Sequence, residues 1–329
     1  MSVTLTRRTA LTALGGSLLA TVAGRAVAQA NYPSRVIRLV VPYAAGGGGD
    51  ALARIMGPKL ADTLGQSVIV DNKPGASGVI GVEAVTHAPA DGYTMLLHTL
   101  PMVMVPAMLT KPPYDPVTDL VPIAEIIYTP LWLVVSTART KATTVKELVE
   151  QVRAEPRKHN FASIAPGSTG HLMGYEFNAQ SKLDMEHVGY KGGAPATQAL
   201  LTGEVTAAFL DFSTLKPHLA GGKIRLLAVS GSERSRNTPD VPTLKELGYV
   251  GFETTSWGGL FFASGTPAPI VQKMSDTVMR LLKDPEIVSK YQGLGYEIPS
   301  ITREQFAQQI KADRDHWANV IRRADIKMN

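Results

Sequence analysis

The sequence predicts an α/β fold in two lobes, each a mostly parallel sheet flanked by helices. Short apolar runs alternate with longer helix-like segments along the 329 residues, an arrangement that favours parallel strands with helices on both faces. The second half repeats this alternation without copying the sequence of the first half. A chain of roughly 300 residues can also bury one large or two ordinary cores.

The expected strands are short apolar runs, and the expected helices have apolar residues three and four positions apart. The strands span residues 36–41, 68–71, 95–98, 131–136, 160–163, 187–188, 207–210, 226–229 and 259–263. The helices span residues 50–64, 144–155, 171–182, 194–202 and 267–283. Gly65 should end the first helix and Asp284-Pro285 the helix at 267–283, while Thr302 and Gln305 should form a capping box for a final helix.

The N-terminus has the pattern of an export signal. Arg7 and Arg8 precede an apolar stretch at 10–23, and small residues at 26–30 offer cleavage sites. We expect residues 1–30 to be a signal peptide, of the twin-arginine or the Sec type. The apolar stretch is short and rich in Thr and Gly for a retained membrane anchor. The mature chain should therefore work in the periplasm.

Charge and composition argue against several classes of protein. The chain has 33 basic and 28 acidic residues, and removal of the signal with its three arginines leaves 30 against 28. This balance, without a basic cluster, does not suggest nucleic-acid binding. The sequence contains no cysteine, so disulfides and thiolate metal sites are excluded.

The most informative motif is a glycine-rich loop between the first strand and the first helix. Pro42 ends the strand, and four consecutive glycines at 46–49 precede Asp50. The free N–H groups of such a helix start form an anion cradle. Gly46-x-Gly48-x-x-Ala51 with Asp71 also fits a loose dinucleotide fingerprint, and the loop alone does not choose between the two. Export makes the dinucleotide interpretation weaker, since nicotinamide cofactors are not supplied outside the cytoplasm.

A second glycine-rich loop, at 166–170, follows the strand at 160–163 and opens the helix at His171. Two such helix starts that face each other across a cleft can hold both ends of a dicarboxylate through neutral N–H donors. Neither loop contains arginine.

Several of these residues have two candidate roles. Asp50 is either a helix N-cap or a ligand contact, while Ser168 and Thr169 can cap the helix and bind an anion at once. His171 is better explained as a packed or hydrogen-bonded helix residue, and Lys191 as a solvated loop residue.

Further candidates follow from position in the chain. Gly193 and Ala194 start a helix and are candidate pocket wall, and Asp211, at a strand end, is a candidate for pocket or hinge. Ser77 is a marginal candidate in the turn at 74–78, and Thr99 is a candidate at the end of its strand.

Several motifs together resemble the Bug family, the extracytoplasmic solute receptors of tripartite tricarboxylate transporters. The motifs lie in the family's order across residues 31–329. They are residues 32–35, 39–47, 70–76, 90–94, 113–116, 167–168 with 171–172, 190–196, 201–205 and 241–243.

The resemblance implies a fold of the periplasmic-binding-protein type II kind, with a ligand cleft between the lobes. It implies a receptor that closes on a small carboxylate, a dicarboxylate or related organic acid, and delivers it to a membrane permease. Lobe 1 is expected at 31–130 plus 255–329 and lobe 2 at 131–254, with crossings near 128–133 and 254–259. The expected ligand-binding residues are Tyr43, Ala44, Ala45, Gly46, Gly47, Gly48, Asp50, Ser77, Thr99, Gly167, Ser168, Thr169, Gly193, Ala194 and Asp211.

The sequence departs from the family pattern near the expected pocket. Gly48 and Gly49 stand where members often have another residue and Thr, and Ala165 stands where a glycine is common. Ser77 and Val79 replace a usual Gly and Asn. These departures bear on the ligand and not on the fold.

Two other function classes compete with a transport receptor. A hydrolase would need a nucleophile elbow, but Ser168 has no glycine two residues upstream, and the seven histidines lack metal-site spacing. A receptor for a membrane sensor would have the same sequence features. We therefore expect a monomer that is not an enzyme and has no cofactor, metal or nucleic-acid partner.

Overall fold

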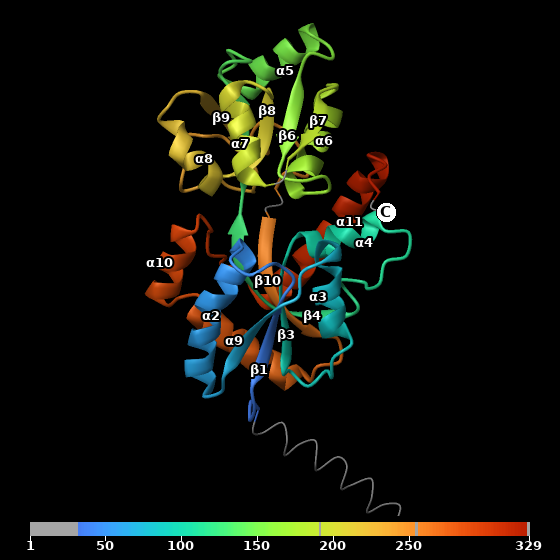
Figure 1. Cartoon of the computed structure of the whole chain (residues 1–329), viewed down its shortest axis with the longest axis vertical. Helices are drawn as coiled ribbons and strands as arrows, with labels where there is room; N and C mark the ends of the chain where they lie inside the picture. The colour runs from blue at the N-terminus through green and yellow to red at the C-terminus, as the bar shows by residue number, and fades with distance from the viewer. Residues whose placement is uncertain (1–31, 191, 254–255, 328–329) are drawn as a thin grey trace, which may run out of the picture.

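The computed structural model describes residues 32–190, 192–253 and 256–327. The predicted signal peptide and Lys191 lie outside the described residues. The molecule has two lobes that follow one another along its long axis, and each contains one five-stranded sheet (Figure 1). Lobe 1 has the strand order β2-β1-β3-β10-β4, and lobe 2 has the order β7-β6-β8-β5-β9.

The strands are found where the sequence predicts them, with one addition. Lobe 1 contains β1 (Ile37–Val41), β2 (Val68–Asn72), β3 (Thr94–Thr99), β4 (Leu120–Thr129) and β10 (Ser256–Ala263). Lobe 2 contains β5 (Leu131–Ser136), β6 (Asn160–Ser163), β7 (Glu186–Gly189), β8 (Ala207–Asp211) and β9 (Ile224–Val229). The sequence analysis missed β4, whose apolar pattern is interrupted by Pro122 and Glu125.

Both sheets are mixed. In lobe 1, β1 pairs in parallel with β2 and β3, while β10 is antiparallel to β3 and β4. In lobe 2, β6 pairs in parallel with β7 and β8, while β5 is antiparallel to β8 and β9. The reason is the path of the chain, because β5 and β10 start where the chain enters a lobe from the other one. They begin at the edge where their neighbours β8 and β3 end, and so run in the opposite direction.

The helices cover both faces of the sheets. They are α2 (Gly48–Leu64), η1 (Ala76–Gly78), α3 (Val79–Thr86), α4 (Pro101–Met108), α5 (Val145–Ala154), α6 (Thr169–Ser181), α7 (Gly193–Thr202), α8 (Phe212–Leu219), α9 (Ala268–Leu281), α10 (Pro285–Gly293) and α11 (Arg303–Arg323). Within the described ranges, no helix combines the length and apolar character needed to cross a membrane.

The helix ends test the predicted caps. Gly65 ends α2 in the left-handed conformation, and Thr302 with Gln305 forms a capping box at α11, so both predictions are confirmed. Asp284 and Pro285 do more than end a helix. Asp284 caps α10, accepting from the N–H of Glu286 at 2.8 Å, and Pro285 is the first residue of that helix.

The four helices α3, α4, α8 and α10 were missed because they are short, and α4, α8 and α10 contain proline. Proline is tolerated at the first turn of a helix, so Pro101 opens α4 and Pro285, which was expected to end the preceding helix, opens α10.

The apolar cores of the two lobes are continuous with each other. One apolar cluster contains Leu96 of lobe 1 and Phe161 of lobe 2. Helix α11 packs on α4 and β4 and also contacts α6. At the end of α11, the Arg323 side chain forms an ion pair with Glu176. The Arg323 carbonyl oxygen accepts a hydrogen bond from the Tyr175 hydroxyl at 2.7 Å. The C-terminal helix therefore contacts both lobes.

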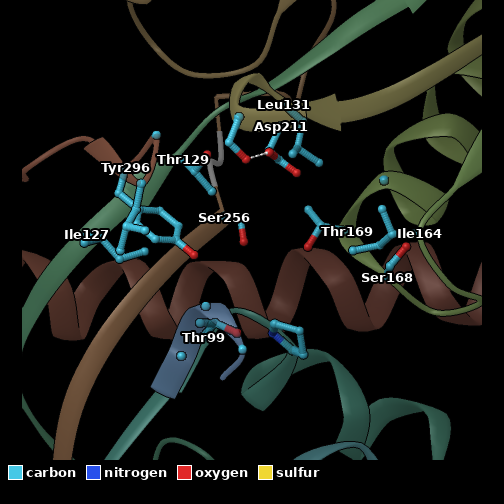
Figure 2. Close-up of a pocket in the computed structure, with 18 of the residues that line it drawn as sticks. Thr99, Ile127, Thr129, Leu131, Ile164, Ser168, Thr169, Asp211, Ser256 and Tyr296 are labelled. Atoms are coloured by element: carbon cyan, nitrogen blue, oxygen red, sulfur yellow. Dashed lines mark hydrogen bonds between the residues drawn. The ribbon is translucent and has the colours of Figure 1, made fainter. Parts of the chain in front are cut away.

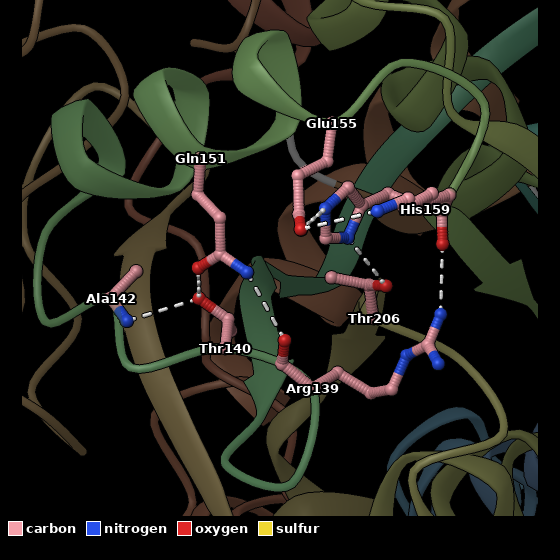
Figure 3. Close-up of polar contacts among 8 residues, drawn as sticks. Arg139, Thr140, Ala142, Gln151, Glu155, His159 and Thr206 are labelled. Carbon is pink, nitrogen blue, oxygen red and sulfur yellow. Dashed lines mark hydrogen bonds and ion pairs between the residues drawn. The ribbon is translucent and has the colours of Figure 1, made fainter.

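The outer end of lobe 2, far from lobe 1, is fixed by a polar network (Figure 3). His159 lies between Thr206 Oγ1 at 3.1 Å and Glu155 Oε2 at 3.2 Å. Thr140 bonds Gln151 at 2.5 Å, which attaches α5 to the segment after β5. His159 thus has a structural role within lobe 2.

Candidate ligand-binding site

A cavity of about 490 Å³ lies between the lobes, at the edge where the parallel strands of both sheets end (Figure 2). Both lobes contribute to its wall. The lining residues are Tyr43, Ala44, Gly47, Gly48, Gly49, Leu52, Thr99, Pro101, Ile127, Thr129, Leu131, Ile164, Ser168, Thr169, Gly170, Phe209, Leu210, Asp211, Ser213, Ser256, Leu294, Gly295 and Tyr296.

The first wall is the start of α2. Gly47 is the N-cap, with φ −81° and ψ 172°, and no side chain caps the helix. The N–H groups of Gly48 and Gly49 therefore have no partner within the helix and lie at its positive end. A Cβ on Gly49 would lie 2.4 Å from Cδ2 of Tyr43, so only glycine fits between this turn and the ring.

Tyr43 and Thr99 supply hydroxyls beside this helix start. Their oxygens share a hydrogen bond at 2.5 Å. Burial raises the pKa of Tyr43 to about 12, although its hydrogen bonds to Thr99 act in the opposite direction. Both groups are therefore uncharged donors or acceptors at neutral pH.

Asp50 lies behind the loop and not in the cavity wall. Its Oδ2 accepts from the N–H of Gly46 and from Nε of Arg54, both at 2.8 Å, and its Oδ1 accepts from Nδ2 of Asn72 at 3.0 Å. The Arg54 hydrogen bond, followed by that from Gly46, lowers the pKa of Asp50 to about 2. The N-cap is Gly47, so the prediction that Asp50 is the cap is wrong. The α-helix starts two residues earlier than expected, and Asp50 instead holds the glycine loop in place.

The second wall is the start of α6. Ser168 caps this helix, and its Oγ accepts from the N–H of His171 at 3.4 Å. The N–H groups of Thr169 and Gly170 lie in the same first turn. A Cβ on Gly170 would lie 2.5 Å from the carbonyl oxygen of Phe209, so glycine lets α6 approach β8 closely.

His171 supports this wall from behind. Its Nδ1 accepts from the N–H of Gly167 at 3.0 Å, and its ring stacks on His187 with centroids 3.6 Å apart. Burial, with a smaller contribution from the charge of His187, lowers the pKa of His171 to about 4. The neutral ring carries its proton on Nε2, since Nδ1 is the acceptor. The interpretation of His171 as a hydrogen-bonded helix residue is confirmed.

The third wall consists of Asp211, Ser213 and Tyr296. Asp211 caps α8, and its Oδ1 accepts from the N–H of Thr214 at 3.1 Å and from the Ser213 hydroxyl. Burial, assisted by the charge of Asp211, raises the pKa of Tyr296. In Figure 2, Tyr296 lies on the side of the cavity away from Ser168 and Ile164.

The structure brings together some of the predicted residues. The predicted residues that line the cavity are Tyr43, Ala44, Gly47, Gly48, Thr99, Ser168, Thr169 and Asp211. The predicted residues outside its lining are Ala45, Gly46, Asp50, Ser77, Gly167, Gly193 and Ala194. Ala45, Gly46 and Gly167 lie in the two glycine-rich loops, and Asp50 lies in the first turn of α2. Ser77 lies in η1, and Gly193 and Ala194 start α7.

The sequence analysis missed many other lining residues. Thr129, Leu131 and Ser256 lie at the chain crossings, whose predicted position was already a signal for them. Leu294 and Tyr296 follow α10, which was not predicted and gave no local signal. The remaining missed residues are Gly49, Leu52, Pro101, Ile127, Ile164, Gly170, Phe209, Leu210, Ser213 and Gly295.

The polar groups of the cavity wall come mainly from helix starts and hydroxyls. Among its described lining residues, Asp211 is the only Asp or Glu and no lysine, arginine or histidine is present, so an acid/base pair is not assembled there. Across the described ranges, no three His, Cys, Asp or Glu side chains are grouped to hold a metal ion. The wall combines helix starts and hydroxyls with apolar side chains, an arrangement that fits a small organic anion.

Comparisons with known proteins agree with this chemistry. The family model described as the tripartite tricarboxylate transporter family receptor matches residues 52–326. BugT of Bordetella pertussis is 33% identical over 323 residues, which are 97% of this chain and 99% of BugT.

Two solved structures are similar in both sequence and fold. A protein of R. palustris, solved with adipate, is 33% identical with a TM-score of 0.74, over 90% of this chain and 99% of that one. MatC of Rhodopseudomonas palustris, solved with bound malate, is 31% identical with a TM-score of 0.71, over 88% and 100%. The resemblance to the Bug family is thus confirmed, and the chain belongs to the receptor family of the tripartite tricarboxylate transporters.

Proposed function

We propose that the chain is a periplasmic receptor that binds a small carboxylate between its lobes and delivers it to the membrane permease of a tripartite tricarboxylate transporter. The observation that carries this proposal is the pair of helix starts, α2 and α6, on one cavity. Such N-termini bind anions through backbone N–H groups. The adipate and malate in the two similar structures support a dicarboxylate or related organic acid as the ligand.

Lobe closure is part of the proposal. We assign residues 31–130 plus 255–329 to lobe 1 and residues 131–254 to lobe 2. In support, β4 ends at Thr129, β5 starts at Leu131, and Ser256 pairs with Thr129. The two crossings are therefore adjacent, as a hinge requires. The receptor works as a monomer, exported by a signal peptide at residues 1–30.

The receptor releases its ligand chemically unchanged. Asp211 has no second ionised group beside it among the described lining residues, which supports this part of the proposal. Carboxylates recovered after incubation should have the same mass as before, and NAD or NADP should not bind in calorimetry. Conversion of a bound acid, or saturable binding of NAD, would contradict the receptor function.

The test is a thermal-shift screen of the mature protein against aliphatic and aromatic mono-, di- and tricarboxylates. A ligand at about 100 times its dissociation constant adds about 2.7 kcal/mol of apparent stability. A panel without any stabilising acid, followed by a null result in calorimetry, would refute carboxylate binding. A pull-down of the liganded protein against permease and sensor subunits distinguishes transport from sensing.

A further inference from the structure

Asp211 gives the cavity a charge of the wrong sign for its proposed ligand. It is the only Asp or Glu in the described part of the wall, and no described lysine, arginine or histidine lines the cavity beside it. A ligand carboxylate placed against Asp211 would be repelled. The carboxylate therefore belongs at the N–H groups of the helix starts and not against the Asp211 side chain.

The Asp211 carboxylate has unused acceptor capacity. The Thr214 N–H and the Ser213 hydroxyl both donate to Oδ1. Within the described residues, Oδ2 receives no hydrogen bond. A carboxylate has about four acceptor positions, and an acceptor that a ligand removes from water without a partner is costly. A bound ligand must therefore present a donor to Asp211 or leave it hydrated.

The cavity wall thus offers both hydrogen-bond donors and an acceptor. The starts of α2 and α6 present donors, through the N–H groups of residues such as Gly48 and Thr169. Asp211 presents an acceptor, and its charge acts on Tyr296. Apolar side chains such as Ile127, Ile164 and Phe209 lie elsewhere in the wall.

We propose that Asp211 selects carboxylates that also carry a hydrogen-bond donor, a hydroxyl or an ammonium group. The carboxylate lies at the starts of α2 and α6, and the donor group bonds Oδ2 of Asp211. The inference rests on the proposed function, because it assumes that the cavity binds a carboxylate.

The experiment uses calorimetry with matched ligands that differ in the donor alone. One series is succinate, malate and aspartate, and the other is 3-phenylpropionate, 3-phenyllactate and phenylalanine. We expect a donor-bearing member of at least one series to bind more than tenfold more tightly than its donor-free relative. An ammonium group should gain the most, because its hydrogen bond to a carboxylate is charge-assisted.

Asp211→Asn tests the residue itself. Asparagine is as good an N-cap as aspartate and keeps an oxygen for the Thr214 N–H, so α8 should remain intact. The variant should lose at least tenfold of the preference for the ammonium ligand. Asp284→Asn is the matched control, since Asp284 also caps a helix but lies outside the cavity lining. It should leave the preference unchanged.

The outcomes separate the two proposals. If carboxylates bind but the donor-free member of each series binds as tightly as the others, the Asp211 inference is wrong and the receptor function stands. The same conclusion follows if Asp211→Asn keeps the full preference. If no carboxylate of the screening panel binds the wild type, both proposals fail.

Discussion

The indole Nε1–H of Trp257 donates to Oδ2 of Asp313 at 2.8 Å, and Asp313 is buried close enough to Glu125 for their charges to interact. Burial, with the charge of Asp313 as a smaller cause, raises the pKa of Glu125 to about 8. Burial raises the pKa of Asp313 to about 7, against the opposing effect of the Trp257 hydrogen bond. Lobe 1 thus contains two acids that retain protons near neutral pH.

These acids predict how stability depends on pH. The unfolded chain releases their protons near pH 4, while the folded chain retains that of Asp313 up to about pH 7 and that of Glu125 up to about pH 8. Their contribution to stability therefore falls as pH rises through this window. The free energy of unfolding of Glu125→Gln should therefore increase relative to that of the wild type as pH rises, by about 2 kcal/mol at pH 8. Denaturant unfolding curves of both proteins at pH 5 and pH 8 measure this difference in the free energy of unfolding. Exposed Glu150→Gln is the control, and a gain that does not change with pH would contradict the prediction.

If backbone N–H groups at the start of α2 bind the ligand, substitutions at that helix start should control the affinity for carboxylates. A Cβ on Gly48 would lie 2.6 Å from the hydroxyl of Tyr296, so Gly48→Val should fill the approach to the α2 start and abolish binding. Gly57→Ala in the same helix is the control, because its Cβ has room, 3.8 Å from Val68. Lys191→Ala should weaken binding by less than about fivefold, roughly 1 kcal/mol. Calorimetry measures all three, and loss of binding in Lys191→Ala as complete as in Gly48→Val would refute the neutral-donor mechanism.

Asp50 should affect binding although it does not line the cavity. Asp50→Asn replaces the charged acceptor of Gly46 and Arg54, and should cost about 2 kcal/mol of stability and loosen the glycine loop. The folded-state pKa of Asp50 is lowered to about 2, so its stabilising contribution is present above about pH 4 and is lost as pH falls toward 2. The stability difference between Asp50→Asn and the wild type should therefore become smaller as pH falls from about 4 to 2. Asp62→Asn, exposed on the same helix, should behave as wild type in melts and in ligand titrations.

His171 positions the second helix start. His171→Phe retains a ring against His187 but removes the acceptor for the N–H of Gly167, so affinity should fall about tenfold, or about 1.4 kcal/mol. The folded-state pKa of His171 is lowered to about 4, so its contribution to stability decreases as pH falls from about 6.5 to 4. The stability of the variant relative to the wild type should therefore increase as pH falls through that range.

His159→Phe provides the control for this variant. His159 is also a buried histidine of lobe 2, but it lies at the outer end of the lobe and contacts Thr206 and Glu155. Its replacement should reduce stability and leave affinity unchanged. Equal losses of affinity in both variants would show that His171 has no specific effect on the cavity.

Closure of the lobes predicts a change in shape. Small-angle scattering of the mature protein should show a smaller radius of gyration with a bound carboxylate than without it. Identical profiles at saturating ligand, with binding verified by calorimetry, would argue against a hinge at the two crossings.

Periodicity was sufficient to predict most of the fold. The strands around Leu39 and Leu133 are short apolar runs, and the loops after β1 and β6 are marked by glycine, so the element order could be read from local pattern. The direction of β5 and β10 could not, because pairing depends on where the chain crosses between lobes. Local pattern also failed for α4 and α10, which are short helices that open with proline.

The site was predictable in part for the same reason. Residues such as Gly48 and Ser168 belong to local motifs whose geometry is set by a helix start. Ile127, Phe209 and Tyr296 come from elements far apart in sequence and meet only when the lobes are assembled. Asp50 shows a different limit, since its sequence position fits a cap but Arg54 and Asn72 draw it behind the loop.

The single residue between β4 and β5, Pro130, leaves the chain no slack at the first crossing, and Ser256 at the second crossing is paired with Thr129 beside it. The proposed hinge is therefore confined to two adjacent chain segments. In a receptor that closes about this hinge, the dimensions of the captured molecule set the angle at which the lobes stop. The shape of the closed receptor then depends on the size of the bound ligand. A membrane partner that contacts both lobes can therefore distinguish ligands without contacting them.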